Sequence, residues 1–183
     1  MGYFGWCRQL SNRNDTQITM QFADTYSLNI QLSDWKSSGK KIVFTNGVFD
    51  ILHLGHVRYL QEARELGDVL VVGINDDSSV KRLNKGPERP IHDEQARAGV
   101  IDSLRCVDAV IIFSDDTPAA LIETLQPDVL VKGGDYDAEE KDPTSKKYVV
   151  GSTETFRRGG KVVCIPLTAG YSTTNAVNKI KKQ

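Results

Sequence analysis

Short apolar segments alternate with helical patterns along most of this chain, and this alternation constrains the fold more than any other feature. Five segments have the length and composition of buried strands, and they are Ile42–Thr45, Val69–Ile74, Ala109–Phe113, Val129–Val131 and Val162–Ile165. Helical patterns lie between and after them, at Gly55–Leu66, Asp76–Leu83, Asp93–Leu104, Pro118–Leu125, Ser152–Arg158 and Thr174–Lys182. Strands that alternate with helices are typical of βαβ units. The sequence therefore predicts an α/β fold with a parallel β-sheet covered by helices on both faces.

Length and composition indicate how the chain is organised. Its 183 residues are enough for one domain with a sizeable hydrophobic core. Residues 1–31 differ from the rest because they are rich in Asn, Gln, Ser and Thr and show no clear hydrophobic period. We interpret them as an N-terminal extension with the composition of a disordered segment. The predicted domain then covers residues 32–183 and begins with a short helix at Leu32–Ser38.

Charge and cysteine content exclude several classes of protein. The 23 basic and 24 acidic residues leave a formal net charge of −1, whereas proteins that coat nucleic acid or membrane surfaces carry a basic excess. No apolar run approaches the roughly 20 residues that cross a bilayer, and the N-terminus lacks the pattern of a secretory signal. Three cysteines at irregular spacing fit a reducing compartment. We therefore expect a cytoplasmic protein that binds neither nucleic acid nor membranes.

The segment from Ile42 to His56 carries the main functional signal. Its order is a strand, a turn that contains Gly47, and a helix that begins near His53 and His56. A helix N-terminus presents unpaired N–H groups and a partial positive charge, so it attracts anions. Two imidazoles on its first turn add further hydrogen-bond donors. Such a set of donors implies a polyphosphate ligand. Ligands of parallel sheets bind beyond the carboxyl ends of the strands, so we expect the polyphosphate at this loop.

Two other interpretations of the histidine pair stay open on the residues alone. The two side chains are suitable helix-capping or surface groups, and imidazole also binds zinc. A zinc site needs further ligands, but His92 is the only other histidine and the cysteines show no metal-ligand spacing. We therefore predict that the chain itself holds no metal ion.

Several motifs resemble those of a known enzyme group. Asn46-Gly-Val-Phe-Asp50 followed by His53-Leu-Gly-His56 resembles the signature of the HxGH nucleotidyltransferase superfamily, in particular its cytidylyltransferase-like branch. The further motifs are Arg89-Pro90-Ile91, Leu104-Arg-Cys-Val-Asp108, Pro127-Asp-Val-Leu-Val-Lys-Gly-Gly-Asp-Tyr136 and Gly170-Tyr-Ser-Thr-Thr174. Taken together over residues 32–182, the set is similar to the adenylyltransferases of ADP-heptose synthesis. The loop 137–147 is longer than this family's pattern, and we interpret it as a lid or a contact surface.

The resemblance implies a Rossmann-like parallel sheet with helices on both faces and a nucleotidyl transfer reaction. The implied substrates are ATP, with Mg²⁺ on its phosphates, and D-glycero-β-D-manno-heptose 1-phosphate, which would yield ADP-heptose and pyrophosphate. A homodimer is common among such proteins and is expected here. Two alternatives stay open: cytidylyl transfer to glycerol 3-phosphate or another small phosphorylated alcohol, and a non-catalytic nucleotide-binding domain.

The same resemblance implies three groups of site residues. The expected catalytic residues are His53, His56, Lys81, Ser172 and Thr173. The expected nucleotide-binding residues are Thr45, Asn46, Gly47, Phe49, Gly55, His56, Lys132, Gly133, Ser172, Thr173 and Thr174. The expected residues for the sugar phosphate are Asp50, Lys85, Arg89 and Asp135.

Several of these residues have a plainer interpretation beside the functional one. At least one hydroxyl among residues 172–174 is expected to be an ordinary helix N-cap. The basic cluster that contains Lys81 and Lys85 has the composition of a solvated helix face. Asp135 either binds a sugar hydroxyl or caps a turn, and Asp50 either orients a histidine or contacts the acceptor.

Overall fold

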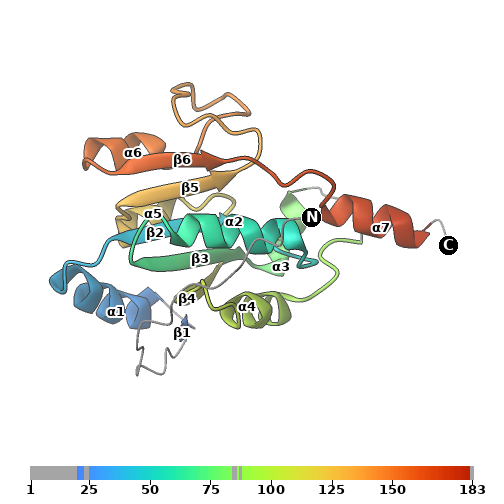
Figure 1. The fold of residues 1–183 in the computed structure, drawn as a ribbon, viewed down its shortest axis with the longest axis horizontal. Coiled ribbons are helices and arrows are strands. Elements are labelled where there is room, and N and C mark those ends of the chain that lie inside the picture. The colour runs from blue at the N-terminus through green and yellow to red at the C-terminus, as the bar shows by residue number, and fades with distance from the viewer. Residues whose placement is uncertain (1–19, 23–24, 84–85, 87, 182–183) are drawn as a thin grey trace, which may run out of the picture.

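A six-stranded parallel sheet forms the centre of the computed structural model (Figure 1), which describes residues 20–22, 25–83, 86 and 88–181. The strands are β1 (Met20–Phe22), β2 (Ile42–Gly47), β3 (Val69–Asn75), β4 (Ala109–Phe113), β5 (Val129–Gly133) and β6 (Lys161–Ile165). The helices are α1 (Thr25–Ser37), α2 (Leu54–Arg64), α3 (Asp77–Arg82), α4 (Glu94–Asp102), α5 (Ala119–Leu125), α6 (Ser152–Arg157) and α7 (Thr173–Lys181). All pairs of neighbouring strands are parallel, so the predicted Rossmann-like α/β fold is confirmed.

The order of the strands defines where a ligand can bind. Across the sheet the order is β1-β4-β3-β2-β5-β6. The chain therefore moves outward from β2 through β3 to β4 and then returns to the other side of β2 with β5. In such sheets the loops that follow the two strands at the reversal diverge and leave a crevice at their carboxyl ends. Here these ends carry Asn46 and Gly47 on β2, and Lys132 and Gly133 on β5.

Two hydrophobic clusters cover the two faces of the sheet. One row of side chains in register runs across the strands on one face, and its members are Ala109, Val71, Phe44, Leu130 and Val162. This row belongs to the cluster that also contains the buried side chains of α1 and α5. The other cluster joins Val43, Val72 and Val131 to the buried faces of α2 and α4. In Figure 1, α2 crosses in front of the strands. Val43 and Phe44 belong to different clusters, because successive side chains of a strand point to opposite faces of the sheet.

The N-terminal part of the domain differs from the sequence-based expectation. Helix α1 begins at Thr25 rather than at Leu32, and Leu28 is fully buried in the core. The predicted boundary after residue 31 therefore falls inside a helix that packs on the sheet. Leu28, Leu32 and Trp35 are spaced four and three residues apart, which places them on one helical face. Strand β1 adds a further parallel pairing at the edge beside β4, and residues 1–19 of the expected extension lie outside the described part of the chain.

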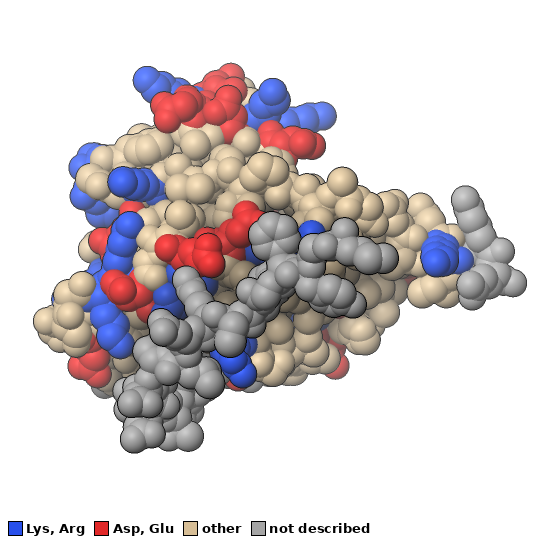
Figure 2. All heavy atoms as spheres, in the orientation of Figure 1, with Lys and Arg blue, Asp and Glu red and all other residues tan. Residues whose placement is uncertain are grey.

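The surface carries charges of both signs. On the face shown in Figure 2, acidic and basic side chains are interspersed, in keeping with the formal net charge of −1. Helix α7 extends away from the sheet in Figure 1, and none of its side chains is buried. Among the described helices, none combines the length and apolar character needed to span a bilayer.

Candidate active site

The two strand ends at the reversal meet through a side-chain contact. The ammonium group of Lys132 on β5 donates a hydrogen bond to the side-chain oxygen of Asn46 on β2, at 2.9 Å. The same ammonium lies 5.3 Å from the centre of the Tyr136 ring. Gly133 lets β5 approach α2 closely, because a Cβ there would lie 3.2 Å from the ring of Tyr59. The crevice predicted from the strand order therefore contains a positioned cation.

The two histidines lie side by side at the start of α2. Their rings are stacked, with centroids 3.8 Å apart and planes 15° from parallel. His53 is the N-cap of the helix, and its Nδ1 accepts a hydrogen bond from the backbone N–H of His56 at 3.3 Å. Burial lowers the pKa of His53 below its ordinary value, which favours the neutral ring. Because Nδ1 accepts, a neutral His53 carries its proton on Nε2, where it is a donor.

Phe49 and two glycines hold the histidine rings in place. Phe49 adopts a left-handed backbone conformation with φ of 48°, and its ring meets His56 edge-on with centroids 5.2 Å apart. A Cβ on Gly47 would lie only 2.9 Å from the Phe49 ring. A Cβ on Gly55 would lie 3.0 Å from Nδ1 of His53. Both glycines are therefore required by close packing around the imidazoles.

The start of α7 lies beside the start of α2. The ring of Tyr171 is 6.5 Å from that of His53 between centroids, and its Cβ would be 3.3 Å from a Cβ on Gly55. The hydroxyl of Ser172 accepts the backbone N–H of Asn175 at 3.0 Å, so the expected N-cap is Ser172. Thr173 and Thr174 open the helix directly after it. Two helix N-termini thus converge on the histidine pair, an arrangement that suits a polyphosphate.

A cavity of about 370 Å³ lies at the carboxyl edge of the sheet. Asn46, Gly47 and Lys132 line it from the strand ends, and residues 116–118 line it from the loop after β4. The remaining wall comes largely from residues 143–150. Neither histidine nor any residue of 172–174 is among its lining residues.

Residues 44–178 match the family model described as cytidylyltransferase-like. The chain belongs to the cytidylyltransferase-like family. The motif resemblance is therefore confirmed, and the stacked histidines are the two that the motif predicts.

Relatives of this family member include the bifunctional protein HldE of Geotalea uraniireducens (strain Rf4), which is 54% identical over 146 residues, 80% of this chain and 28% of that protein. The bifunctional protein HldE of Syntrophotalea carbinolica is 51% identical over 154 residues, 84% of this chain and 30% of that protein. The chain thus spans less than one third of the length of these relatives.

Solved structures also resemble this cytidylyltransferase-like chain. The lipopolysaccharide core biosynthesis protein from Thermoplasma volcanium is 31% identical with a TM-score of 0.54, over 71% of this chain and 98% of that one. A pantoate-beta-alanine ligase from Francisella tularensis, solved with an ATP form and beta-alanine, has a TM-score of 0.56 at 16% identity, over 90% of this chain and 78% of that one. The second likeness concerns the fold alone.

Asp50 and Arg89, two of the residues predicted to contact the sugar phosphate, bind each other in this cytidylyltransferase-like site. Asp50 is buried, forms an ion pair with Arg89, and accepts the backbone N–H groups of Ile91 at 2.8 Å and His92 at 2.9 Å. Burial alone would raise the pKa of Asp50, but the backbone hydrogen bonds from His92 and Ile91 and the Arg89 cation hold it below its usual value. The pair fixes the loop after β2 to residues 89–92.

Other predicted residues of the family motif lie in different places. Thr45 is fully buried, and its hydroxyl shares a hydrogen bond with the hydroxyl of Tyr59 inside the protein. Lys81 is exposed on the last turn of α3. Asp135 lines a shallow hollow with Asp137, Lys147 and Cys164 and does not line the cavity. Lys85 lies outside the described residues.

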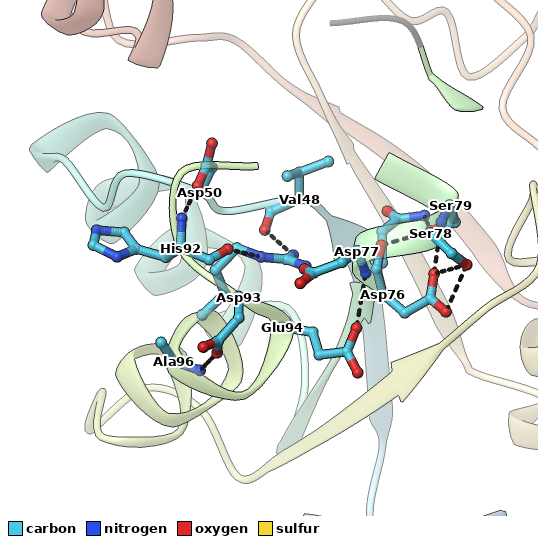
Figure 3. Close-up of polar contacts among 12 residues, drawn as sticks. Val48, Asp50, Asp76, Asp77, Ser78, Ser79, His92, Asp93, Glu94 and Ala96 are labelled. Carbon is cyan, nitrogen blue, oxygen red and sulfur yellow. Dashed lines mark hydrogen bonds and ion pairs between the residues drawn. The ribbon is translucent and has the colours of Figure 1, made fainter. Parts of the chain in front are cut away.

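Arg97 is a buried cation that we did not predict. Its guanidinium donates to the carbonyl oxygens of Val48 at 2.7 Å and His92 at 3.0 Å, and to the carboxylate of Asp77 at 2.7 Å. Figure 3 shows Val48, His92 and Asp77, the three residues that accept these hydrogen bonds. It therefore joins the loop after β2 to the starts of α3 and α4. A signal was present, because Arg97 precedes buried Ile101 by one helical turn and so falls on the apolar face of its helix.

Proposed function

We propose that this protein is a nucleotidyltransferase that transfers AMP from ATP to D-glycero-β-D-manno-heptose 1-phosphate and releases pyrophosphate. The observation that carries the proposal is the stacked histidine pair at the start of α2, beside the start of α7 and at the reversal of the sheet. The acceptor follows from the motif set. The relatives named HldE and the lipopolysaccharide core biosynthesis protein support it.

The reaction requires the protein to align two anions, ATP and the phosphate of the acceptor. An oxygen of the acceptor phosphate forms a bond to the α-phosphorus of ATP, and the bond from that phosphorus to the bridging oxygen breaks. Pyrophosphate leaves with the electron pair. Negative charge grows on the transferred and leaving groups, so fixed donors in a partly desolvated site favour the transition state.

The chain provides such donors from three directions. The Nε2–H of His53 and the ring of His56 lie where α2 begins, and the backbone N–H groups and hydroxyls of residues 172–174 lie where α7 begins. Lys132, oriented by Asn46, supplies a cation between the strand ends. We assign the histidines and residues 172–174 to the triphosphate and Lys132 to the meeting point of the two substrates.

Magnesium belongs to the same proposal. Among the described residues, no group of three or more His, Cys, Asp or Glu side chains could hold a metal ion. This suits Mg²⁺, which binds mainly through substrate phosphate oxygens and water. When bound with ATP it neutralises phosphate charge, and the residues above hold the phosphates themselves.

Pyrophosphate release tests the proposal directly. Purified protein is incubated with ATP, Mg²⁺ and heptose 1-phosphate, and in parallel with CTP and glycerol 3-phosphate. We expect turnover in the first mixture. Turnover only in the mixture with CTP and glycerol 3-phosphate would replace the proposal by cytidylyl transfer. If no combination of nucleotide and acceptor yields pyrophosphate, the protein is a non-catalytic nucleotide-binding domain.

His56→Ala tests the histidine pair. Loss of one donor to the transition state should reduce kcat by about 10²–10³-fold. The free energy of unfolding, measured in urea, checks that the variant is folded. Undiminished turnover in a folded variant would contradict the assigned role.

We also propose that the protein acts in the cytoplasm and forms a homodimer. Both follow from the expected substrates and from the family resemblance. Light scattering on the purified protein should give about twice the chain mass of 20.3 kDa, and a mass equal to one chain would contradict the dimer.

A further inference from the structure

Two consecutive residues near the end of β2 connect this strand to opposite faces of the sheet. Thr45 lies on the same face as Val43, which belongs to the hydrophobic cluster that contains the buried side of α2. Asn46 lies on the face of Phe44, in the other cluster, and accepts the hydrogen bond from Lys132. The end of β2 therefore lies between the cation on one face and the helix with the histidine pair on the other.

Tyr59 joins α2 to both strands at the reversal of the sheet. Its hydroxyl shares a hydrogen bond with the hydroxyl of Thr45 at 2.5 Å, which ties the helix to β2. Its ring packs on Gly133 of β5, where a Cβ would lie only 3.2 Å from a ring carbon. Tyr59 follows His56 by three residues, so the two lie about one turn apart on the same side of α2. One side chain thus contacts both strand ends and stands next to the histidine pair.

The hydrogen bond between the two hydroxyls is enclosed by the protein. Thr45 is fully buried, and Tyr59 is 9% exposed. Burial raises the pKa of the Tyr59 hydroxyl above its ordinary value, so the group keeps its proton at neutral pH. A buried pair of hydroxyls adds little net stability over apolar side chains of the same shape. A satisfied hydrogen bond does, however, fix the distance between the elements that it joins.

We infer that Tyr59 and Thr45 are positioning residues, whose hydrogen bond holds the histidine pair at the separation from Lys132 that the transfer needs. Both hydroxyls act through the placement of α2 and touch no substrate. The physical reason is that a shift of about 1 Å in a group that aligns the reacting atoms can cost about 100-fold in rate. This proposal rests on the proposed transfer reaction and adds the residues that align its two sets of donors.

Two substitutions that keep the shape of the side chains remove the hydroxyls one at a time. Tyr59→Phe keeps the ring that packs on Gly133, and Thr45→Val keeps the branched side chain. We expect kcat to fall about tenfold in each, because the displaced donors act on charge that grows in the transition state. The KM for ATP should stay within about twofold. Thr45→Ser retains the hydroxyl and should keep kcat within about twofold of the wild type.

The double variant Tyr59→Phe/Thr45→Val separates positioning from stability. Each single substitution leaves one buried hydroxyl without its partner, whereas the double variant leaves none. The midpoint of urea unfolding should therefore return toward that of the wild type. The expected kcat of the double variant is still about tenfold low, because the link is absent. If kcat recovers together with the urea midpoint, the bond serves stability alone and the inference is overturned.

Thr155→Val is the matched control for Thr45→Val. Thr155 is also fully buried, and its hydroxyl donates to the carbonyl of Gly151 at 2.8 Å at the start of α6. This substitution should lower the urea midpoint and leave kcat unchanged, and an equal loss of kcat would overturn the inference. A rise in the KM for ATP in Thr45→Val but not in Tyr59→Phe would place the Thr45 hydroxyl on the nucleotide, which would also overturn it.

A measurement without turnover separates this inference from the proposed function. If the wild type is inactive, the proposed reaction fails, and nitrogen-15 NMR of the imidazole rings decides the positioning role. The chain contains three histidines, His53, His56 and His92, so their ring signals can be assigned by substitution. Signals of His53 and His56 that shift in Tyr59→Phe and in the double variant, but not in Thr155→Val, would support the inference. Unchanged signals would overturn it.

Discussion

A single nitrogen of His53 links helix capping to the chemistry of the site. Nδ1 accepts the N–H of His56, so protonation of the ring removes the acceptor that caps α2. The same bond leaves the ring proton on Nε2, the atom available to a phosphate. One hydrogen bond thus sets the start of the helix, the stacking of the two rings and the direction of a donor.

This arrangement predicts a pH-dependent stability. The fold lowers the pKa of His53, so the folded state binds this proton less readily than the unfolded chain, whose histidines titrate near 6.5. The stabilisation is therefore complete above about pH 6.5 and is lost as the pH falls toward the lower pKa of the folded state. His53→Asn keeps a capping oxygen but does not titrate. Its Tm should decline less than that of the wild type between about pH 8 and 5.5, and equal declines would contradict the assignment.

Gly47 offers a second test at the scale of one atom. Gly47→Ala places a methyl group 2.9 Å from the Phe49 ring, so the ring that faces His56 must shift and kcat should fall about tenfold or more. Gly99→Ala is the control, because a Cβ there meets nothing within 4 Å and lies inside helix α4. That control should gain about 0.5–1 kcal/mol in unfolding free energy with unchanged turnover.

The residues of the site could be predicted where they lie close together in the sequence. The histidine pair, Gly47 and Gly55 belong to one local motif, and the structure brings them together. Asp50 pairs with groups about 40 positions away, such as the N–H of Ile91. No local pattern encodes that pairing, so a charge that looked available for substrate is used inside the protein.

At the scale of elements, buried Arg97 connects the loop after β2 to two helix starts. It is 1% exposed and contacts Val48, His92 and Asp77. Figure 3 shows the neighbouring caps as well, in which Asp93 accepts the N–H of Ala96 and Glu94 that of Asp77. The loop that carries the catalytic motif is therefore held from the side of α3 and α4.

Arg97→Met should test this connection. Loss of the buried cation leaves two carbonyls and a carboxylate without their donor, so the free energy of unfolding should fall by about 3–5 kcal/mol. Urea denaturation measures this change. Arg105→Met is the control, since Arg105 is exposed just after the same helix and should shift the free energy by no more than about 0.5 kcal/mol. A similar small effect at Arg97 would show that the link is dispensable.

Regular elements of the chain were predictable because their hydrophobic periods are clear. Each of the five expected strands and each helical pattern that follows them has its counterpart in the structure. Strand β1 was missed because three residues are too few to show an alternation, and its pairing depends on β4, far along the chain. The shape of the loop 137–147 depends on hydrogen bonds within it, such as that between Asp137 and Lys147, and a loop shows no hydrophobic period.

At the scale of the whole molecule, the core includes the part of helix α1 that lies before the expected start of the domain at residue 32. Leu28→Ala should lower the free energy of unfolding by about 2–5 kcal/mol, because it opens a hole in the cluster between α1 and α5. Ile30→Ala on the same helix removes a side chain that is 54% exposed and should cost little. Equal effects of the two substitutions, measured in urea, would return the domain boundary to residue 32.

Helix α7 carries Ser172 and Thr173 at its start, yet the core does not enclose it, and its far end is held by an ion pair between Lys181 and Glu88. A ligand bound at the first turn would then be the main restraint on the motion of α7. Amide protons of α7 should consequently exchange with deuterium more slowly once ATP is added, whereas those of β3, enclosed on both faces, should be slow from the outset.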